Sequence, residues 1–184
     1  CLVGSEMCIR DSFQFESQGM TNFMKELKPD CLEDIIAGVS LYRPGPMDQI
    51  PRYIANKKDP EHAVYTHPAL KPILKVTYGC MVYQEQVMQI VRDLAGYSLG
   101  RADLVRRAMG KKKLDVMARE REIFINGQLD EDGNIVVPGC VRNGIDAESA
   151  NRIFDEMAEF AKYAFNKSHA AAYAVVSYLS LIHI

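Results

Sequence analysis

The chain has 184 residues, of which 48% are hydrophobic and 25% charged, and its formal net charge is -2 at pH 7. This composition fits one globular domain and excludes the overall basic charge that marks many nucleic-acid-binding proteins. The 5 cysteines form no CxxC pair and no histidine stands at ligand spacing to another, which disfavours a zinc site or a disulfide framework and favours a reducing, cytoplasmic setting. No apolar run is long enough for a membrane-spanning helix.

The two ends of the chain differ from the rest. Residues 1–12 (CLVGSEMCIRDS) show neither helical nor strand periodicity, and residues 179–184 are apolar and stop abruptly. Both resemble translated sequencing-adapter sequence, so we expect them to be artefacts and exclude them from fold prediction. A frayed natural terminus is the alternative. On the first interpretation, the chain is a truncated piece of a longer protein.

The remaining sequence predicts a mainly α-helical domain with a short turn or β-arm near residues 130–140. Apolar residues recur at the spacing of half-buried helices, and glycines and prolines separate these stretches. The expected helices, in chain order, span residues 31–40, 49–57, 84–94, 99–109, 114–126, 147–162 and 170–178.

Capping residues set the expected starts of several helices. Asp30 followed by Glu33 has the spacing of a capping box at the first of them. Ser98 and Asp146 stand where N-caps of two later helices are expected. The stretch 130–137 reads as an acidic turn followed by a short strand.

The segment YRPGPM, residues 42–47, predicts a stiff corner after the first helix. Pro44 biases Arg43 away from the helical conformation, and a second proline follows at residue 46. A rigid turn could present Arg43 to a ligand, but the pattern alone favours a structural corner.

Basic residues concentrate between residues 101 and 121, where eight of them face three acids. Within this block Arg106 and Arg107 close a predicted helix, and a glycine and three lysines follow, namely Lys111, Lys112 and Lys113. Arginine binds phosphate oxygens as a planar fork and lysine as a point charge, so the block is a candidate polyanion site. A solvated helix end that favours cations through its dipole is the alternative, and spacing leaves both open.

The segment FNKSHAAAY, residues 165–173, places polar residues before an alanine-rich helix. The N–H groups of its first turn, together with Lys167, would favour an anion, and the small residues would let another surface approach closely. Asn166 or Ser168 could instead only cap the helix. For His169, spacing alone favours a buried core histidine.

The segment around Gln84 and Glu85 favours a structural role. We expect these two side chains to form a buried hydrogen-bonding cluster that fixes helix packing. Catalytic motifs are lacking: the sequence has no close carboxylate pair on an apolar strand, as two-metal phosphoryl transfer requires, and no GxxxxGK[ST], GxGxxG or GxSxG motif. No catalytic or metal-binding residue is therefore predicted.

Five ordered segments together resemble one family, the alpha subunits of bacterial DNA polymerase III, which are C-family replicative polymerases. The resemblance covers about residues 13–178. The segments are FQFES (13–17), LYRPGPM (41–47), YGCMVYQEQVMQI (78–90), LAGYSLGRADLVRRAMGKKK (94–113) and FAKYAFNKSHAAAYAVVSY (160–178). The resemblance implies that residues 13–40 form the palm–fingers junction and residues 41–178 a truncated fingers domain.

The resemblance also implies site residues. In this family the fingers close over the incoming deoxynucleoside triphosphate and contact primer–template DNA. Arg106 and Arg107 match arginines that approach the triphosphate. Lys167 and His169 match a helix facing the nascent base pair, with His169 near the sugar, where it helps to exclude a 2′-hydroxyl. Contacts to phosphate or DNA are expected of Arg43, Lys111, Lys112 and Lys113, with the role of Arg43 the least defined.

The resemblance implies that catalysis depends on regions outside this chain. The parent enzyme uses Mg²⁺, bound by palm aspartates that this chain lacks, so the chain alone is expected to be inactive. Sliding clamp and clamp loader would bind the parent through other regions. A non-enzymatic helical module that binds nucleic acid through residues 101–121 is the main alternative, and a helical scaffold with no nucleic-acid role is another.

Overall fold

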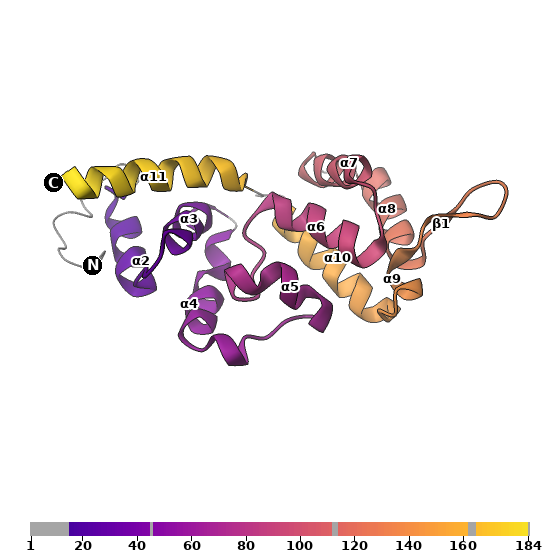
Figure 1. Ribbon diagram of the computed structural model, residues 1–184, viewed down its shortest axis with the longest axis horizontal. Coiled ribbons are helices and arrows are strands. Elements are labelled where there is room, and N and C mark those ends of the chain that lie inside the picture. Colours follow the sequence, from indigo (N-terminus) through magenta and orange to yellow (C-terminus); the bar gives the residue numbers. More distant parts are fainter. Residues whose placement is uncertain (1–14, 45, 112–113, 162–164, 184) are drawn as a thin grey trace.

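The computed structural model describes residues 15–44, 46–111, 114–161 and 165–183. These residues are mainly helical and include a two-stranded antiparallel sheet, which confirms the predicted fold class (Figure 1). The helices are α2 (Gln18–Leu27), α3 (Leu32–Leu41), α4 (Ile50–Lys58), α5 (Lys71–Leu74), α6 (Gln84–Ala95), α7 (Leu99–Gly110), α8 (Leu114–Asn126), α9 (Gly139–Arg142), α10 (Ala147–Ala161) and α11 (Lys167–His183), and the strands are β1 (Gln128–Leu129) and β2 (Ile135–Val137). Four short 3-10 turns connect them: η1 (Pro46–Gln49), η2 (Pro60–His62), η3 (Pro68–Leu70) and η4 (Lys75–Thr77).

Several predicted helix boundaries are confirmed by hydrogen bonds at the caps. The Ser98 hydroxyl accepts the N–H of Arg101 at 3.3 Å at the start of α7. The Asp146 carboxylate accepts the N–H of Ser149 at 2.8 Å at the start of α10. These caps satisfy N–H groups that have no partner within the first helical turn.

The predicted capping box at Asp30 is wrong. Cys31 is the N-cap of α3 and forms no side-chain cap, while the Asp34 carboxylate accepts the N–H of Asp30 at 3.1 Å. Asp34 takes this position because its other partner, Lys57 of α4, holds it in the interior at 2.7 Å. The acidic group that orders this helix start is therefore Asp34 rather than the Asp30 and Glu33 pair.

The last helix begins earlier than predicted. α11 starts at Lys167 instead of residue 170, because the Asn166 side chain accepts the N–H of His169 at 3.2 Å and caps the helix there. The helix also continues to His183, past the predicted end at residue 178. Residues 162–164, which include the predicted end of the helix at 147–162, lie outside the described residues, as do residues 1–14, which include the amino-terminal segment 1–12.

Two buried apolar clusters hold the molecule together. One cluster is formed by the helices from α5 through α10 and includes Ile90, Phe124 and Phe154. The other joins α2, α3, α4 and α11 and includes Leu41 and Tyr53. Figure 1 shows the same division, with α11 lying along α3 at one end and α6 to α10 gathered towards the other. Burial of these side chains is the main driving force for both halves.

Two of the segments at which the chain passes between the two halves pair with each other. Tyr83 and Phe165 form an isolated parallel β-bridge, and the N–H of Gln84 donates to the carbonyl of Phe165 at 3.0 Å. This pairing fixes the start of α6 against the residues that precede α11. It places segments from the middle and the end of the chain at one junction.

The predicted β-arm is a hairpin that projects from the helical body (Figure 1). Its tip is ordered by Asp130, whose carboxylate accepts the N–H groups of Asp132 and Asn134 at 3.0 and 2.7 Å. At its base Gly127 has a φ of 84° and lies against the Pro138 carbonyl, where a Cβ atom would clash. Only glycine fits such a position without strain.

Among the described residues, no helix is both long and apolar enough to cross a membrane.

Candidate functional site

The first turn of α6 brings together predicted site residues from two other helices. Gln84 Oε1 accepts a hydrogen bond from Arg106 Nη1 of α7 at 2.6 Å. The next residue, Glu85, accepts the backbone N–H of Lys167 at the start of α11, with both carboxylate oxygens at 3.2 Å. Arg106 and Lys167 therefore flank one helix end, although they are far apart in the sequence. We call this region the α6 junction: Gln84, Glu85, Arg106, Lys167 and their direct partners.

A buried glutamine supports the α6 junction from beneath. Gln86 Oε1 accepts the N–H groups of Val82 and Tyr83, each at 2.9 Å, and its amide nitrogen donates to Thr77 Oγ1 at 2.8 Å. The expected buried cluster at Gln84 and Glu85 is therefore wrong in its residues, because both are only partly buried and Gln86 is the buried member. The amide satisfies polar groups that would otherwise be costly to bury.

The two predicted arginines share one carboxylate. Asp103 Oδ1 lies 2.7 Å from Arg106 Nη2, and its Oδ2 lies 2.6 Å from Arg107 Nη2. The hydrogen bonds from Arg106 and then from Arg107 hold the pKa of Asp103 below its ordinary value, because both favour the ionised carboxylate. The side chain of Arg106 is 27% exposed and that of Arg107 is 62% exposed, so Arg107 is the more accessible cation.

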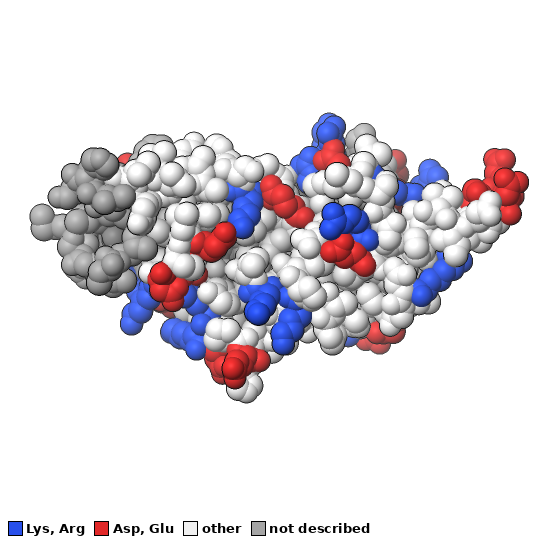
Figure 2. All heavy atoms as spheres, viewed as in Figure 1, with Lys and Arg blue, Asp and Glu red and all other residues white. Residues whose placement is uncertain are grey.

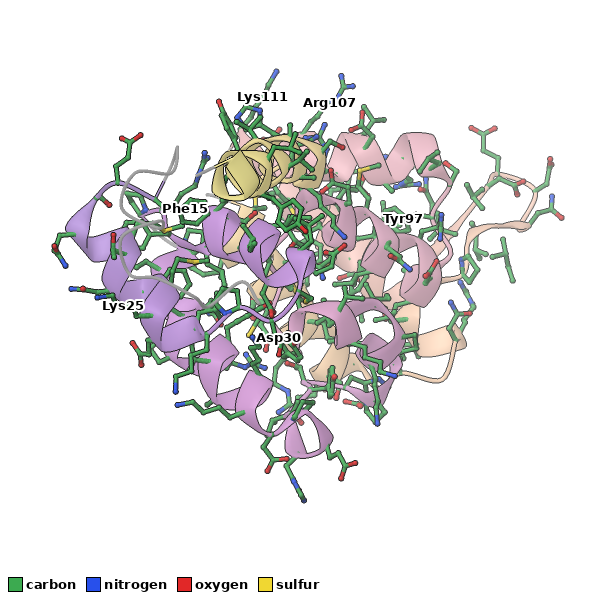
Figure 3. The ribbon with its side chains drawn as sticks, turned by 60° about the vertical axis from the view of Figure 1, so that its left-hand side comes forward. Phe15, Lys25, Asp30, Tyr97, Arg107 and Lys111 are labelled. Carbon is green, nitrogen blue, oxygen red and sulfur yellow. The ribbon has the colours of Figure 1, made fainter. Side chains whose placement is uncertain are left out.

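The lysines that follow α7 are described only in part. Lys111 is exposed and its N–H donates to the carbonyl of Arg107 at 3.0 Å at the helix end. Figure 3 shows Arg107 and Lys111 pointing outward on the same side of the molecule. Lys112 and Lys113 lie outside the described residues. Lys111 thus adds a second accessible positive charge on the side of the molecule where Arg107 lies.

The rest of the basic block does not form a single cationic face. Arg101 pairs with Glu120 at 3.1 Å and donates to Gln128 at 2.6 Å, so it ties α7 to α8 and to the hairpin. Arg121 pairs with Asp155 of α10. In Figure 2, basic side chains over α7 lie beside acidic ones, and no continuous basic patch covers the face shown. Several members of the block are therefore structural.

Lys167 is held by two carboxylates from different helices. Its Nζ lies 3.0 Å from Glu33 of α3, while its backbone N–H donates to Glu85. The ammonium also lies 5.2 Å from the centre of the Tyr83 ring, within the range of a cation–π contact. Glu85 thus takes the place at this helix N-terminus that an anionic ligand could occupy.

His169 is exposed, which corrects the expectation of a core histidine. Its ring stands edge-on between two aromatic rings, with centroid distances of 5.2 Å to Phe165 and 4.5 Å to Tyr173. Arg43 completes the row, because its guanidinium carbon lies 3.5 Å from the Phe165 ring centroid. The stiff corner at residues 42–47 therefore does aim its arginine at another site segment.

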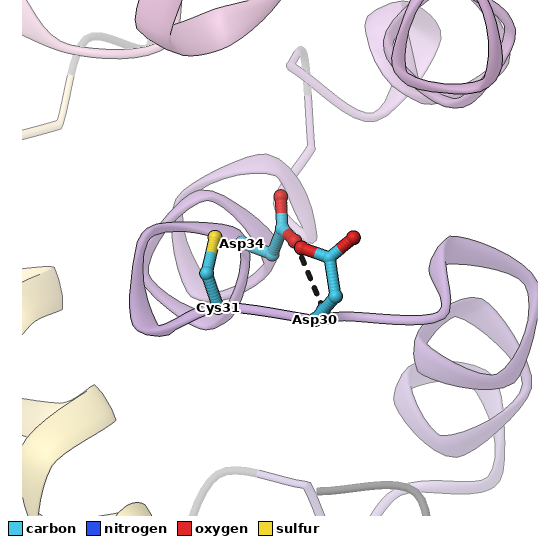
Figure 4. Close-up of side chains that lie close together, drawn as sticks. All are labelled: Asp30, Cys31 and Asp34. Atoms are coloured by element: carbon cyan, nitrogen blue, oxygen red, sulfur yellow. Dashed lines mark hydrogen bonds between the residues drawn. The ribbon is translucent and has the colours of Figure 1, made fainter. Parts of the chain in front are cut away.

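The described residues offer one group of possible metal ligands, Asp30, Cys31 and Asp34, whose ligand atoms lie within 4.8 Å of one another (Figure 4). Lys57 already supplies a cation there, with its Nζ 2.7 Å from Asp34 and 3.7 Å from Asp30. An ammonium at that distance would repel a divalent ion. This group does not fit Mg²⁺.

Sequence reasoning missed Asp103, Gln86, Glu33, Phe165 and Tyr173. Two of them carry a local signal. Asp103 stands three and four residues before the arginine pair, the spacing of helical ion pairs. Gln86 shares the helical spacing of the apolar stripe at Ile90 and Leu94, which marks a polar side chain facing the core.

Comparison with known proteins identifies the class. The family described as "Bacterial DNA polymerase III alpha subunit finger domain" matches residues 6–132, more than half of the chain. The helical fold is thus that of a polymerase finger domain. The chain belongs to the finger-domain family of bacterial DNA polymerase III alpha subunits, which confirms the resemblance.

Individual relatives agree over nearly the whole chain. It is 55% identical over 166 residues to the DNA polymerase III subunit alpha of Xylella fastidiosa strain Temecula1, which covers 90% of this chain and 13% of that protein. The subunit of Pasteurella multocida strain Pm70 is 52% identical over 179 residues (92% and 14%), and that of Chlamydia trachomatis serovar D is 52% identical over 166 residues (90% and 12%). The chain therefore spans only about an eighth of these relatives.

Proposed function

We propose that this chain is the part of a replicative DNA-directed DNA polymerase that binds the incoming deoxynucleoside triphosphate and primer–template DNA. Residues 13–40 would form the palm–fingers junction and residues 41–178 the fingers. The parent enzyme transfers a nucleotidyl group from the triphosphate to the primer 3′-hydroxyl. We expect no polymerase activity from residues 13–178 by themselves, because in this family the aspartates that hold the metal belong to the palm.

One observation carries the proposal: the residues predicted to meet the triphosphate come from two helices that both bond to the first turn of α6. Arg106 bonds to that turn through its guanidinium and Lys167 through its backbone N–H, and the Lys167 ammonium lies 5.2 Å from the centre of the Tyr83 ring, just before α6. Arg107 and Lys111 extend the charge outward (Figure 3). A triphosphate spreads its charge over several oxygens, so binding needs several donors fixed at once. The junction supplies donors in that form.

In the proposed site, carboxylates hold the cations until nucleotide arrives. Asp103 pairs with both arginines and Glu33 pairs with the ammonium of Lys167. When the triphosphate binds, its oxygens replace the carboxylates as partners of these cations. The arginines then neutralise charge that develops on the triphosphate oxygens during the reaction. His169, in its row of rings, faces the sugar of the bound nucleotide.

Metal and partner proteins belong to other regions of the parent. Mg²⁺ bound by palm aspartates stabilises the attacking and leaving oxygens of the transfer. The described acidic group at Asp30 and Asp34 takes no part in this, because Lys57 already pairs with both carboxylates. Sliding clamp and clamp loader bind the parent elsewhere. A plain nucleic-acid-binding module is less well supported, because Arg101 and Arg121 of the basic block are committed to packing.

Nucleotide-dependent DNA binding tests the proposal. The protein is a full-length polymerase of this family carrying residues 13–178, and the DNA is a primer–template whose primer ends in a dideoxynucleotide. We expect the complementary dNTP to tighten binding and the three mismatched dNTPs to have little effect. If the affinity for primer–template DNA depends on salt concentration but is unchanged by any dNTP, the proposal is rejected in favour of plain DNA binding.

A further inference from the structure

We propose that Arg43 is a positioning residue that sets the orientation of His169, and so the enzyme's preference for deoxyribose over ribose. The inference rests on the proposed function, in which His169 faces the nucleotide sugar. Arg43 acts through the Phe165 ring and does not itself contact the nucleotide phosphates.

The contacts of Arg43 favour a stacking role. Its guanidinium carbon lies only 3.5 Å from the Phe165 ring centroid. Among the described residues it has no hydrogen bond from its guanidinium and no carboxylate partner. Burial lowers the pKa of Arg43, while the nearby Tyr173 opposes this shift. The side chain is thus partly removed from water to meet a ring, without an ion pair to explain it.

Phe165 is held from two directions, so it can transmit position. Its carbonyl accepts the N–H of Gln84, and its backbone bridges to Tyr83, which fixes the main chain. Arg43 covers the ring from the corner that follows α3. A planar guanidinium on a ring face limits how that ring can tilt.

His169 depends on Phe165 for its own orientation. The planes of the His169 and Phe165 rings meet at 82°, and those of His169 and Tyr173 at 87°. An exposed imidazole with no packed neighbours would sample several rotamers, whereas two perpendicular contacts favour one. If Phe165 tilts, the Phe165 contact of His169 is lost and the ring is free to move.

The expected defect is therefore one of selectivity. A residue that binds phosphate would weaken dNTP and rNTP alike, because the two share the triphosphate. A residue that orients a group at the sugar changes the ratio of their kcat/KM values. Discrimination by shape around a single hydroxyl is sensitive to small displacements of the discriminating side chain.

The test uses the full-length polymerase carrying residues 13–178, with kcat and KM measured for a dNTP and the matching rNTP. The variants are Arg43→Ala, Arg43→Lys and His169→Ala, and Arg92→Lys on the exposed face of α6 is the control. Lysine keeps the charge but loses the planar stack. We expect both Arg43 variants to lower the dNTP/rNTP ratio of kcat/KM about tenfold, the scale of one cation–π contact. The control should leave the ratio unchanged.

A double variant makes the test specific. Arg43→Lys added to His169→Ala should lower the ratio no further, because both act through one side chain. An equal rise in KM for both nucleotides in Arg43→Ala, restored by Arg43→Lys, would overturn the inference in favour of a direct phosphate contact. A changed dNTP/rNTP ratio in His169→Ala, with an unchanged ratio in both Arg43 variants, would overturn the inference about Arg43 but leave the proposed function standing. No effect in His169→Ala would contradict the proposed role of His169 as well.

Discussion

The Arg106 guanidinium donates to Gln84 Oε1 at 2.6 Å and thereby joins α7 to the first turn of α6. Its neighbour Arg107 makes no such link and points outward with a 62% exposed side chain. Two adjacent arginines of the same motif therefore differ in kind. Arg106 joins two helices, whereas, among the described residues, Arg107 bonds only within its own helix and is largely accessible to solvent.

This difference predicts unequal effects on stability. Arg106→Ala removes a charged hydrogen bond between two helices and should lower the free energy of unfolding by about 1.5–3 kcal/mol. Arg107→Ala should stay within about 0.5 kcal/mol of wild type, because it changes only an exposed ion pair. Chemical denaturation of the 184-residue chain measures both. Equal losses for the two variants would mean that the Gln84 contact contributes nothing.

Gln86 is expected to be the most sensitive polar residue of the junction. Gln86→Leu keeps the volume but leaves the N–H groups of Val82 and Tyr83 without their acceptor. Leaving a buried donor unsatisfied costs about 1–3 kcal/mol, so the loss in unfolding free energy should be at least that large. Gln89→Leu, an exposed position on the same helix, is the matched control and should change stability little. Similar values for the two variants would refute the supporting role of Gln86.

The Lys57 and Asp34 pair predicts a pH-dependent effect. Burial raises the pKa of Asp34, but the hydrogen bonds from Lys57 and from Asp30 outweigh it and leave the pKa below its ordinary 3.8. A folded-state pKa below the unfolded value means that the stabilisation is complete above about pH 4 and is lost as pH falls through the folded value. Lys57→Met should lower the free energy of unfolding by about 3–5 kcal/mol at pH 7, because it leaves the buried Asp34 carboxylate without its positive partner.

The sign of this effect can be checked by lowering the pH. In Lys57→Met, burial without the ion pair raises the pKa of Asp34, so this carboxyl takes a proton already above about pH 4. The deficit against wild type should therefore shrink progressively as pH falls from about 7, and further below about pH 4, where wild type loses its own stabilisation. Adding Asp34→Asn should recover much of the stability at pH 7. A deficit that stays constant between pH 7 and pH 3 would show that the ion pair is not its cause.

Local signals in the sequence predicted the longer helices from α3 onward and the strand β2, but they missed α2, the short helices α5 and α9, and β1. The bounds of α8 at residues 114 and 126 and the strand at 135–137 match, because a glycine or an acidic turn marks their ends. The start of α11 lies before the predicted residue 170, because Asn166 in the polar run is the residue that caps the helix. Pairings between distant segments, such as Glu85 with Lys167 and Arg43 with Phe165, depend on how the helices pack in three dimensions. No local period encodes such contacts.

The central claim is that Arg107 binds the triphosphate of the incoming nucleotide. The most direct measurement replaces the fingers of a full-length polymerase of this family with residues 13–178, completed by the host's downstream fingers residues, and follows primer extension against dNTP concentration. We predict templated extension whose kcat/KM falls about 100- to 1,000-fold in Arg107→Ala, the usual loss for one donor to developing charge, while primer–template affinity changes little. Wild-type dNTP kinetics in that variant would contradict the account.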